Sequence, residues 1–166
     1  MMHRLARAFD AVSNISSASA HCDIPCKIYD PSTALIAALS VVRLMDIMAE
    51  TADGKDPQSL EALNTIARCT YRKEEEAEKV KQETRIIWGD YFKTPQIEAF
   101  PEIHGLTHEI MLRASACKQN TAREDGEALV DLVNRFAEIF WTTKEIETIR
   151  HPCPYPPGLA TIYPVL

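Results

Sequence analysis

Apolar residues recur every three to four positions along four long segments of this chain, which is the spacing of helices with one buried face. The first face follows Asp30 and Pro31, residue types that suit an N-cap and a first helical position. Its apolar positions are Leu35, Leu39, Val42, Met45 and Met48. The other segments are residues 57–91, 101–118 and 121–147. Because no segment alternates apolar and polar residues as a strand does, the sequence predicts an all-α fold, an antiparallel up-and-down four-helix bundle over residues 31–147.

Two further segments flank the predicted bundle. Residues 1–20 are rich in Ser and Ala and end in Ala-Ser-Ala, which resembles a small-residue cleavage site, so we expect a removable pro-segment or targeting leader. The absence of a continuous apolar stretch argues against a secretory signal and leaves a transit peptide and a cytosolic pro-segment as alternatives. Residues 148–166 contain five prolines and cannot continue a helix, so they are predicted to form an extended or disordered proline-rich tail.

The composition limits the classes of function that fit. The 166 residues are 46% hydrophobic, which is enough for one domain with a real core. A net charge of −6 gives no electrostatic support for a nucleic-acid or anionic-membrane partner. We expect no apolar run to reach the roughly 18 residues of a membrane span. Five cysteines do not suit a disulfide-stapled secreted domain, so a cytoplasmic location is expected, or an organelle if residues 1–20 act as a transit peptide.

The densest chemistry lies in residues 21–30, which we interpret as a metal-binding hook. His21 directly precedes Cys22, and three residues separate Cys22 from Cys26. Alone, this cysteine spacing is also found in redox thiols and in fragments of zinc sites. If the chain is cut before His21, the freed amine, the amide nitrogen of Cys22 and the two thiolates make a planar set of two nitrogens and two sulfurs. Such a set favours Ni(II) or Cu(II) over tetrahedral zinc, and the His21 imidazole can add a fifth, axial ligand.

Seven positions in and after this hook resemble the N-terminus of nickel-containing superoxide dismutases. They are His21, Cys22, Pro25, Cys26, Tyr29, Asp30 and Pro31. Two later blocks, over residues 88–106 and 139–144, resemble further characteristic segments of that family. The resemblance covers roughly residues 21 to 145.

The resemblance implies a helical homohexamer with one nickel ion per subunit, made as a precursor that a processing protease cuts before His21. The implied reaction converts superoxide to oxygen and hydrogen peroxide by Ni(II)/Ni(III) cycling. The implied nickel ligands are His21, Cys22 and Cys26. Tyr29 and Tyr91 are implied to guard the pocket that superoxide enters, to position an anion or water and to relay protons.

The resemblance implies that two more residues support the hook. The sequence departs from the family pattern at three positions. Asp23 is expected to tie the hook to the protein body, and the peptide bond before Pro25 is expected to be cis. Lys27 stands where the family usually has glycine, so the backbone there is expected to lose its tolerance for positive φ. The family's usual glutamate and arginine beside the axial imidazole fall at Ala37 and Glu76.

This last departure leads to a hypothesis for Glu76. Its carboxylate would accept the second ring N–H of His21, as partners of metal-bound histidines do. The alternative is an ordinary solvated charge within the run of residues 72–76.

Two other functions stay open on the residues alone. A thiol redox protein would use Cys22 and Cys26 without metal and with the leader attached. A metal-storage or interaction bundle would bind nickel but cycle poorly. Lys27 and Lys93 lie beside the expected pocket and could attract an anion, although surface lysines without a role are the simpler interpretation.

Overall fold

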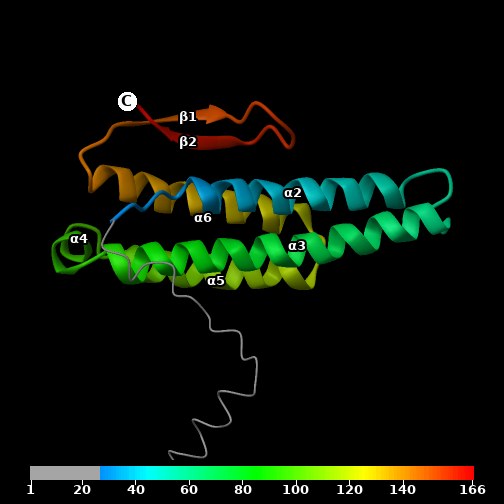
Figure 1. The fold of residues 1–166 in the computed structure, drawn as a ribbon, viewed down its shortest axis with the longest axis horizontal. Helices are drawn as coiled ribbons and strands as arrows, with labels where there is room; N and C mark the ends of the chain where they lie inside the picture. Colours follow the sequence, from blue (N-terminus) through cyan, green and yellow to red (C-terminus); the bar gives the residue numbers. More distant parts are fainter. Residues whose placement is uncertain (1–26) are drawn as a thin grey trace, which may run out of the picture.

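The structure, a computed structural model, describes residues 27–166 as a set of lengthwise helices with a two-stranded sheet on one side (Figure 1). The elements are α2 Ser32–Ala52, α3 Leu60–Ile86, the π-helix η1 Ile87–Tyr91, α4 Thr94–Ala99, α5 Ile103–Gln119, α6 Arg123–Thr142, β1 Thr148–Pro152 and β2 Ala160–Pro164. The prediction of a mostly helical chain is confirmed. The prediction of an all-α fold is wrong at the C-terminal tail, which forms the sheet.

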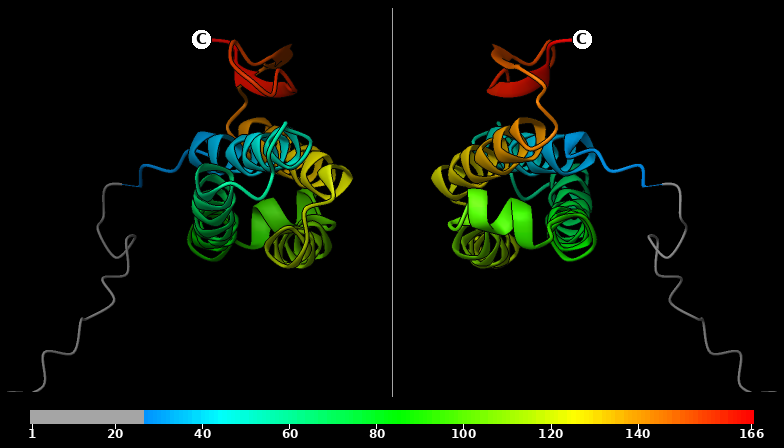
Figure 2. Two further views of the ribbon diagram at one scale, coloured as in Figure 1. Left: turned by 90° about the vertical axis from the view of Figure 1, so that its right-hand side faces the viewer. Right: turned by 90° about the vertical axis from the view of Figure 1, so that its left-hand side faces the viewer.

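The four long helices run in alternating directions and pack as two layers. α2 contacts α3 and α6, and α5 contacts the same two helices. The end-on views show α2 and α6 in one layer, with α3 and α5 in the other (Figure 2). The sheet lies on the outer side of the α2–α6 layer and contacts α6.

Short side chains allow α2 to lie close to its neighbours. Its buried residues are Ala34, Leu35, Ala37, Ala38, Leu39, Val41, Val42 and Met45. A methyl group added at Gly126 on α6 would come within 2.9 Å of a Val42 methyl, so this glycine permits close approach of the two helices.

The apolar character of α2 also corrects an expectation. By length and composition α2 could cross a membrane, with a mean hydropathy of 1.6. The expectation that no apolar run reaches spanning length is therefore wrong. In this fold 44% of the apolar window is buried, which is how the core helix of a globular protein passes the same test.

The helix boundaries follow local hydrogen bonds. α2 begins at Ser32 with Pro31 at its N-cap, one residue later than expected, and the Asp30 carboxylate accepts a hydrogen bond from the Ser32 amide at 2.7 Å. α3 begins at Leu60 instead of near residue 57, because Ser59 is its N-cap and accepts from the Ala62 amide at 3.2 Å. α6 ends at Thr142, before the expected residue 147.

The long second segment, predicted as one helix that could be interrupted, is interrupted at Ile87. From there the chain adopts the wider π-helical turn of η1 and leaves it at Phe92, whose amide donates to the Ile87 carbonyl at 3.4 Å. π-turns inside helices often occur at functional sites. Tyr91 is the last residue of this turn.

A buried lysine connects α3 to the C-terminal end of α5. Lys73 is 2% exposed, and its ammonium donates to the carbonyls of Lys118 at 3.0 Å and Asn120 at 2.8 Å, and to that of Cys117. These carbonyls lie where a helix has no further amide donors, so the three donors of the lysine match three acceptors. Burial lowers the pKa of Lys73.

The C-terminal tail is a docked β-hairpin and not the expected extended or disordered segment. β1 and β2 are antiparallel, with Ile149 opposite Tyr163. The fully buried Asn134 of α6 holds β2 with both ends of its amide: it donates to the Ala160 carbonyl and accepts from the Ile162 amide, both at 2.9 Å. The helix side chain thus satisfies backbone groups of β2 that its partner strand leaves unpaired.

Candidate functional site

Two tyrosines distant in the sequence meet at the end of the bundle where η1 lies. Tyr29 precedes α2 and Tyr91 ends η1, and their ring centroids are 5.9 Å apart with the planes tilted by 54°. Both rings are half-buried against the core. The Tyr91 ring also packs on Phe140 of α6, with a centroid separation of 4.8 Å. The structure therefore brings together the two residues expected to guard the pocket.

The Tyr91 hydroxyl is hydrogen-bonded to the end of α6. It lies 2.7 Å from the hydroxyl oxygen of Thr143, whose own hydroxyl donates to the Phe140 carbonyl at 2.6 Å. The ammonium of the next residue, Lys144, lies 4.8 Å from the centre of the Tyr91 ring, in cation–π contact. Neither Thr143 nor Lys144 was predicted from the sequence to take part in the site, although both lie in the last block of the family resemblance.

The two lysines expected beside the pocket are both exposed. The Lys93 ammonium donates to the Gly89 carbonyl at 3.0 Å, which holds it against η1. Lys27 is two residues before Tyr29 in the sequence. With Lys144 they place three positive charges in segments that meet around the tyrosine pair, in a chain whose net charge is −6.

Lys27 adopts the left-handed backbone conformation, with φ = +53°. The expectation that replacing glycine removes the tolerance for positive φ is therefore wrong for the conformation, although the energetic cost stays. A side chain in this region costs about 1–2 kcal/mol because its Cβ approaches the backbone.

The hook residues themselves, His21, Cys22, Asp23, Pro25 and Cys26, lie outside the described residues. Within residues 27–166 no group of three or more His, Cys, Asp or Glu side chains could hold a metal ion. The cysteines of this part, Cys69, Cys117 and Cys153, are buried and carry free thiols.

Burial makes the Cys117 thiol a poor metal ligand. It raises the pKa of Cys117 to about 11, so that its thiol stays protonated. The cysteines left to supply thiolates are Cys22 and Cys26. Sulfur ligands in a planar set with nitrogen suit nickel, so the donor set of the hook fits this metal.

Glu76 lies apart from the tyrosine pair. It is 15 positions before Tyr91 on α3 and η1, which corresponds to roughly 20 Å along the helix axis. Its carboxylate is ion-paired with Arg72 at 2.8 Å, and its side chain is 14% exposed. Ala37, the other departure from the family pattern, is fully buried in the core.

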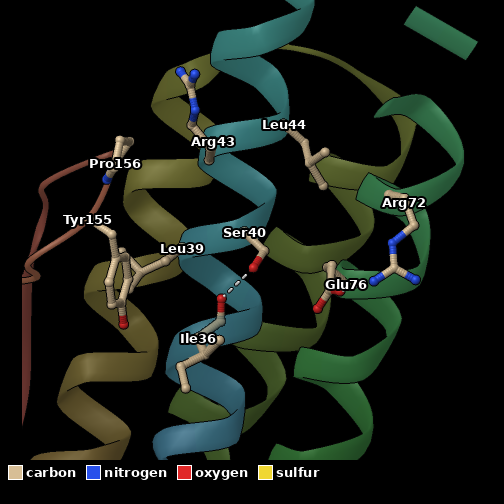
Figure 3. Close-up of a pocket in the computed structure, with 9 residues that line it drawn as sticks. All are labelled: Ile36, Leu39, Ser40, Arg43, Leu44, Arg72, Glu76, Tyr155 and Pro156. Carbon is tan, nitrogen blue, oxygen red and sulfur yellow. Dashed lines mark hydrogen bonds and ion pairs between the residues drawn. The ribbon is translucent and has the colours of Figure 1, made fainter. Parts of the chain in front are cut away.

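Glu76 contributes to a cavity of about 300 Å³ between α2, α3 and the hairpin (Figure 3). The cavity is lined by Ile36, Leu39, Ser40, Arg43, Leu44, Arg72, Glu76, Tyr155 and Pro156. Figure 3 shows Glu76 and Arg72 on α3 facing α2, with Tyr155 of the hairpin on the other side of α2.

Comparison with known proteins identifies the family. The family model described as nickel-containing superoxide dismutase matches residues 16–144. Superoxide dismutase [Ni] of Streptomyces seoulensis is 39% identical over 127 residues, covering 76% of this chain and 90% of the relative. The corresponding protein of Streptomyces coelicolor is 37% identical over the same length and with the same coverage.

Solved structures agree with the sequence comparison. A crystal structure of Ni-containing superoxide dismutase in the oxidized state superimposes with a TM-score of 0.67 at 38% identity, over 75% of this chain and 99% of that chain. A native structure of nickel superoxide dismutase gives 0.66 at 36% identity over the same shares. The chain therefore belongs to the nickel-containing superoxide dismutase family, whose members are oxidoreductases that act on superoxide with a nickel cofactor.

Proposed function

We propose that this chain disproportionates superoxide to oxygen and hydrogen peroxide after cleavage before His21, with nickel held by His21, Cys22 and Cys26. When bound, nickel supplies the Ni(II)/Ni(III) couple that takes an electron from one superoxide and gives one to the next. Family membership supports the reaction. The observation that carries the site assignment is the approach of Tyr29 to Tyr91 within three residues of the second hook cysteine.

Chain length limits where the hook can lie. Three residues span at most about 10 Å, so a site that uses Cys26 has to form near Tyr29. Tyr29 packs against Tyr91, which supports the proposal that the hook ends beside the tyrosine pair. Asp23 and Pro25 lie within the same segment, where we propose that they hold and turn the hook.

The residues around the pair suit an anionic substrate. Lys27, Lys93 and Lys144 contribute positive charge in the segments that carry the tyrosine pair, on a protein of net charge −6, and local positive charge attracts anions. The two phenol groups can hold water or a protonated product at the entrance. The Tyr91 ring packs on Phe140 and the Tyr29 ring packs on Tyr91, so one side of the pair is covered by the core.

The role of Glu76 stays a proposal with a stated alternative. Its carboxylate can accept the ring N–H of His21 only if the hook extends from Tyr29 toward the middle of α3, or comes from a neighbouring subunit. The ion pair with Arg72 supports the alternative, a charge that is already compensated. A Glu76→Gln variant with unchanged turnover and an unchanged nickel electron-spin signal would establish that alternative.

Further proposals concern processing and assembly. We propose that a protease removes residues 1–20, that the four long helices are the antiparallel up-and-down bundle of the family and that the mature chain forms a homohexamer. The proposed location is the cytoplasm, or an organelle if the leader is a transit peptide.

The deciding experiment examines protein purified from its native host. N-terminal sequencing is expected to begin at His21, with about one nickel ion per subunit and superoxide turnover that disappears in a Cys22→Ser variant. A Cys69→Ser variant is the matched control, because Cys69 is buried on α3 and is not a proposed nickel ligand. A mature chain that begins at Met1 would contradict the proposed ligand set. Thiol–disulfide exchange without nickel would instead support the redox protein, and bound nickel without turnover would support metal storage.

A further inference from the structure

The hydroxyl groups of Tyr91 and Thr143 form a directed chain of hydrogen bonds. A carbonyl oxygen can only accept, so the 2.6 Å contact between Thr143 and the Phe140 carbonyl uses the single hydroxyl hydrogen of Thr143. The 2.7 Å contact between the Tyr91 and Thr143 oxygens must then use the hydrogen of Tyr91. Tyr91 is therefore the donor, Thr143 relays, and Phe140 is the terminal acceptor.

The end of α6 explains why Thr143 keeps its hydrogen on Phe140. The last carbonyls of a helix have no amide partner four residues later. Here the Lys144 amide donates to the Trp141 carbonyl at 3.0 Å instead of to that of Phe140. Phe140 is fully buried, and a buried carbonyl without a donor is unfavourable. Rotating the Thr143 hydroxyl toward Tyr91 would leave this carbonyl without its donor.

We propose that Thr143 is a positioning residue that fixes Tyr91 as a hydrogen-bond acceptor toward the pocket. This inference rests on the proposed function, in which Tyr91 lines the entrance for superoxide. With its only hydrogen directed to Thr143, the Tyr91 oxygen offers lone pairs to incoming groups. It accepts from water or from hydrogen peroxide, and it does not donate to the superoxide anion.

The same arrangement divides two tasks between neighbouring residues. Attraction of the anion falls to positive charge, and the Lys144 ammonium lies 4.8 Å from the centre of the Tyr91 ring. The direction of the Tyr91 hydroxyl group distinguishes the anion from the protonated product, because its oxygen can accept a hydrogen bond from the product but cannot donate one to the anion. Consecutive residues at the end of α6 thereby control both properties of one phenol group.

The test uses azide as an anion that competes with superoxide turnover in the nickel-loaded, processed enzyme. Thr143→Val preserves the shape of the side chain but releases the Tyr91 hydrogen, which can then donate to an anion. The azide inhibition constant is expected to fall about tenfold or more, the range of one added hydrogen bond to a charged group. Thr143→Ser keeps a hydroxyl and is expected to restore the wild-type constant. In a Tyr91→Phe background, Thr143→Val is expected to have no effect on azide.

An unchanged or increased inhibition constant in Thr143→Val overturns the proposal, because a merely damaged site binds azide more weakly. A gain in azide affinity that persists without the Tyr91 hydroxyl also overturns it. Nickel content and circular dichroism of each variant verify that the fold and the hook are intact. If Tyr91→Phe alone leaves turnover unchanged, the role of Tyr91 in the proposed function fails. The thermal stabilities of the single and double variants then still measure the coupling between the two hydroxyls.

Discussion

Replacing Asn134 by alanine tests what holds the C-terminal hairpin on the bundle. Asn134 is fully buried on α6 and forms two 2.9 Å hydrogen bonds to the backbone of β2, one in each direction. Alanine removes both partners at once. The Ala160 carbonyl and the Ile162 amide then lose their partners where little water can replace them, because Ile162 is only 5% exposed.

The expected loss follows from these two groups. A buried backbone group that loses its partner costs about 1–3 kcal/mol, so two groups predict a loss of about 2–6 kcal/mol if the hairpin stays docked. If undocking costs less than this, the hairpin detaches and the loss in global stability is smaller. Arg150→Ala is the matched control, because its ion pair with Asp131 is exposed on both sides and such pairs contribute about 1 kcal/mol or less.

The assay combines denaturant unfolding with the reactivity of Cys153, which is 5% exposed beneath the hairpin turn. Alkylation is located by peptide mass, so that labelling of Cys153 is distinguished from labelling of Cys22 and Cys26. In Asn134→Ala we expect either a lower free energy of unfolding or rapid labelling of Cys153, and in Arg150→Ala neither. A stable Asn134→Ala protein with a protected Cys153 would refute the reasoning that this amide docks the hairpin.

Four further predictions concern the backbone, the core and pH. Lys27→Gly should raise the free energy of unfolding by a few tenths to about 1 kcal/mol, because glycine accepts φ = +53° without strain, whereas Lys27→Val should lower it; both are measured by denaturation. Gly126→Ala should destabilise the protein by about 1–2 kcal/mol, because the added methyl group contacts Val42. Gly105→Ala is its control and should be neutral or stabilising in the same assay, because the added methyl group would meet no atom within 4 Å outside its own stretch of helix backbone. Lys73→Met should lower the melting temperature markedly, because it leaves the three carbonyls at the end of α5 without a buried donor; Lys79→Met is the control on the same helix. Burial raises the pKa of Cys117 from 9.0 to about 11, so as the pH rises the thiol loses its proton in the unfolded chain before it does in the folded protein. The free energy of unfolding should therefore fall between about pH 9 and pH 11. Cys117→Ala should flatten that part of the pH profile of stability.

The features that local sequence patterns encode could be predicted. The apolar spacing after Asp30 predicts a core helix, and the structure has α2 there. The family blocks predicted that Tyr29 and Tyr91 belong to one site, and the structure brings their rings together. Both predictions depend on short-range periodicity or on a distinctive motif, which a single sequence displays directly.

The features that depend on distant partners could not be predicted. The hairpin is fixed by Asn134, which lies more than twenty residues before β2 and has no local sign of that role. Thr143 resembles any threonine at a helix end until the structure places it 2.7 Å from the Tyr91 oxygen. The positive φ of Lys27 opposes the preference of its residue type, so it is imposed by the surrounding chain.

The π-turn of η1 makes the site sensitive to insertion and deletion as well as to substitution. Each residue of an α-helix advances the side-chain direction by about 100°, and η1 already closes its turn with the five-residue spacing of a π-helix, so insertion of one more residue between Ile87 and Tyr91 would turn Tyr91 by about that angle. Its ring would leave Tyr29, and its hydroxyl would leave Thr143, while every functional side chain remained in the chain. Relatives of this protein are thus expected to tolerate changes of length in their loops and tails, but to keep the residue count of this turn.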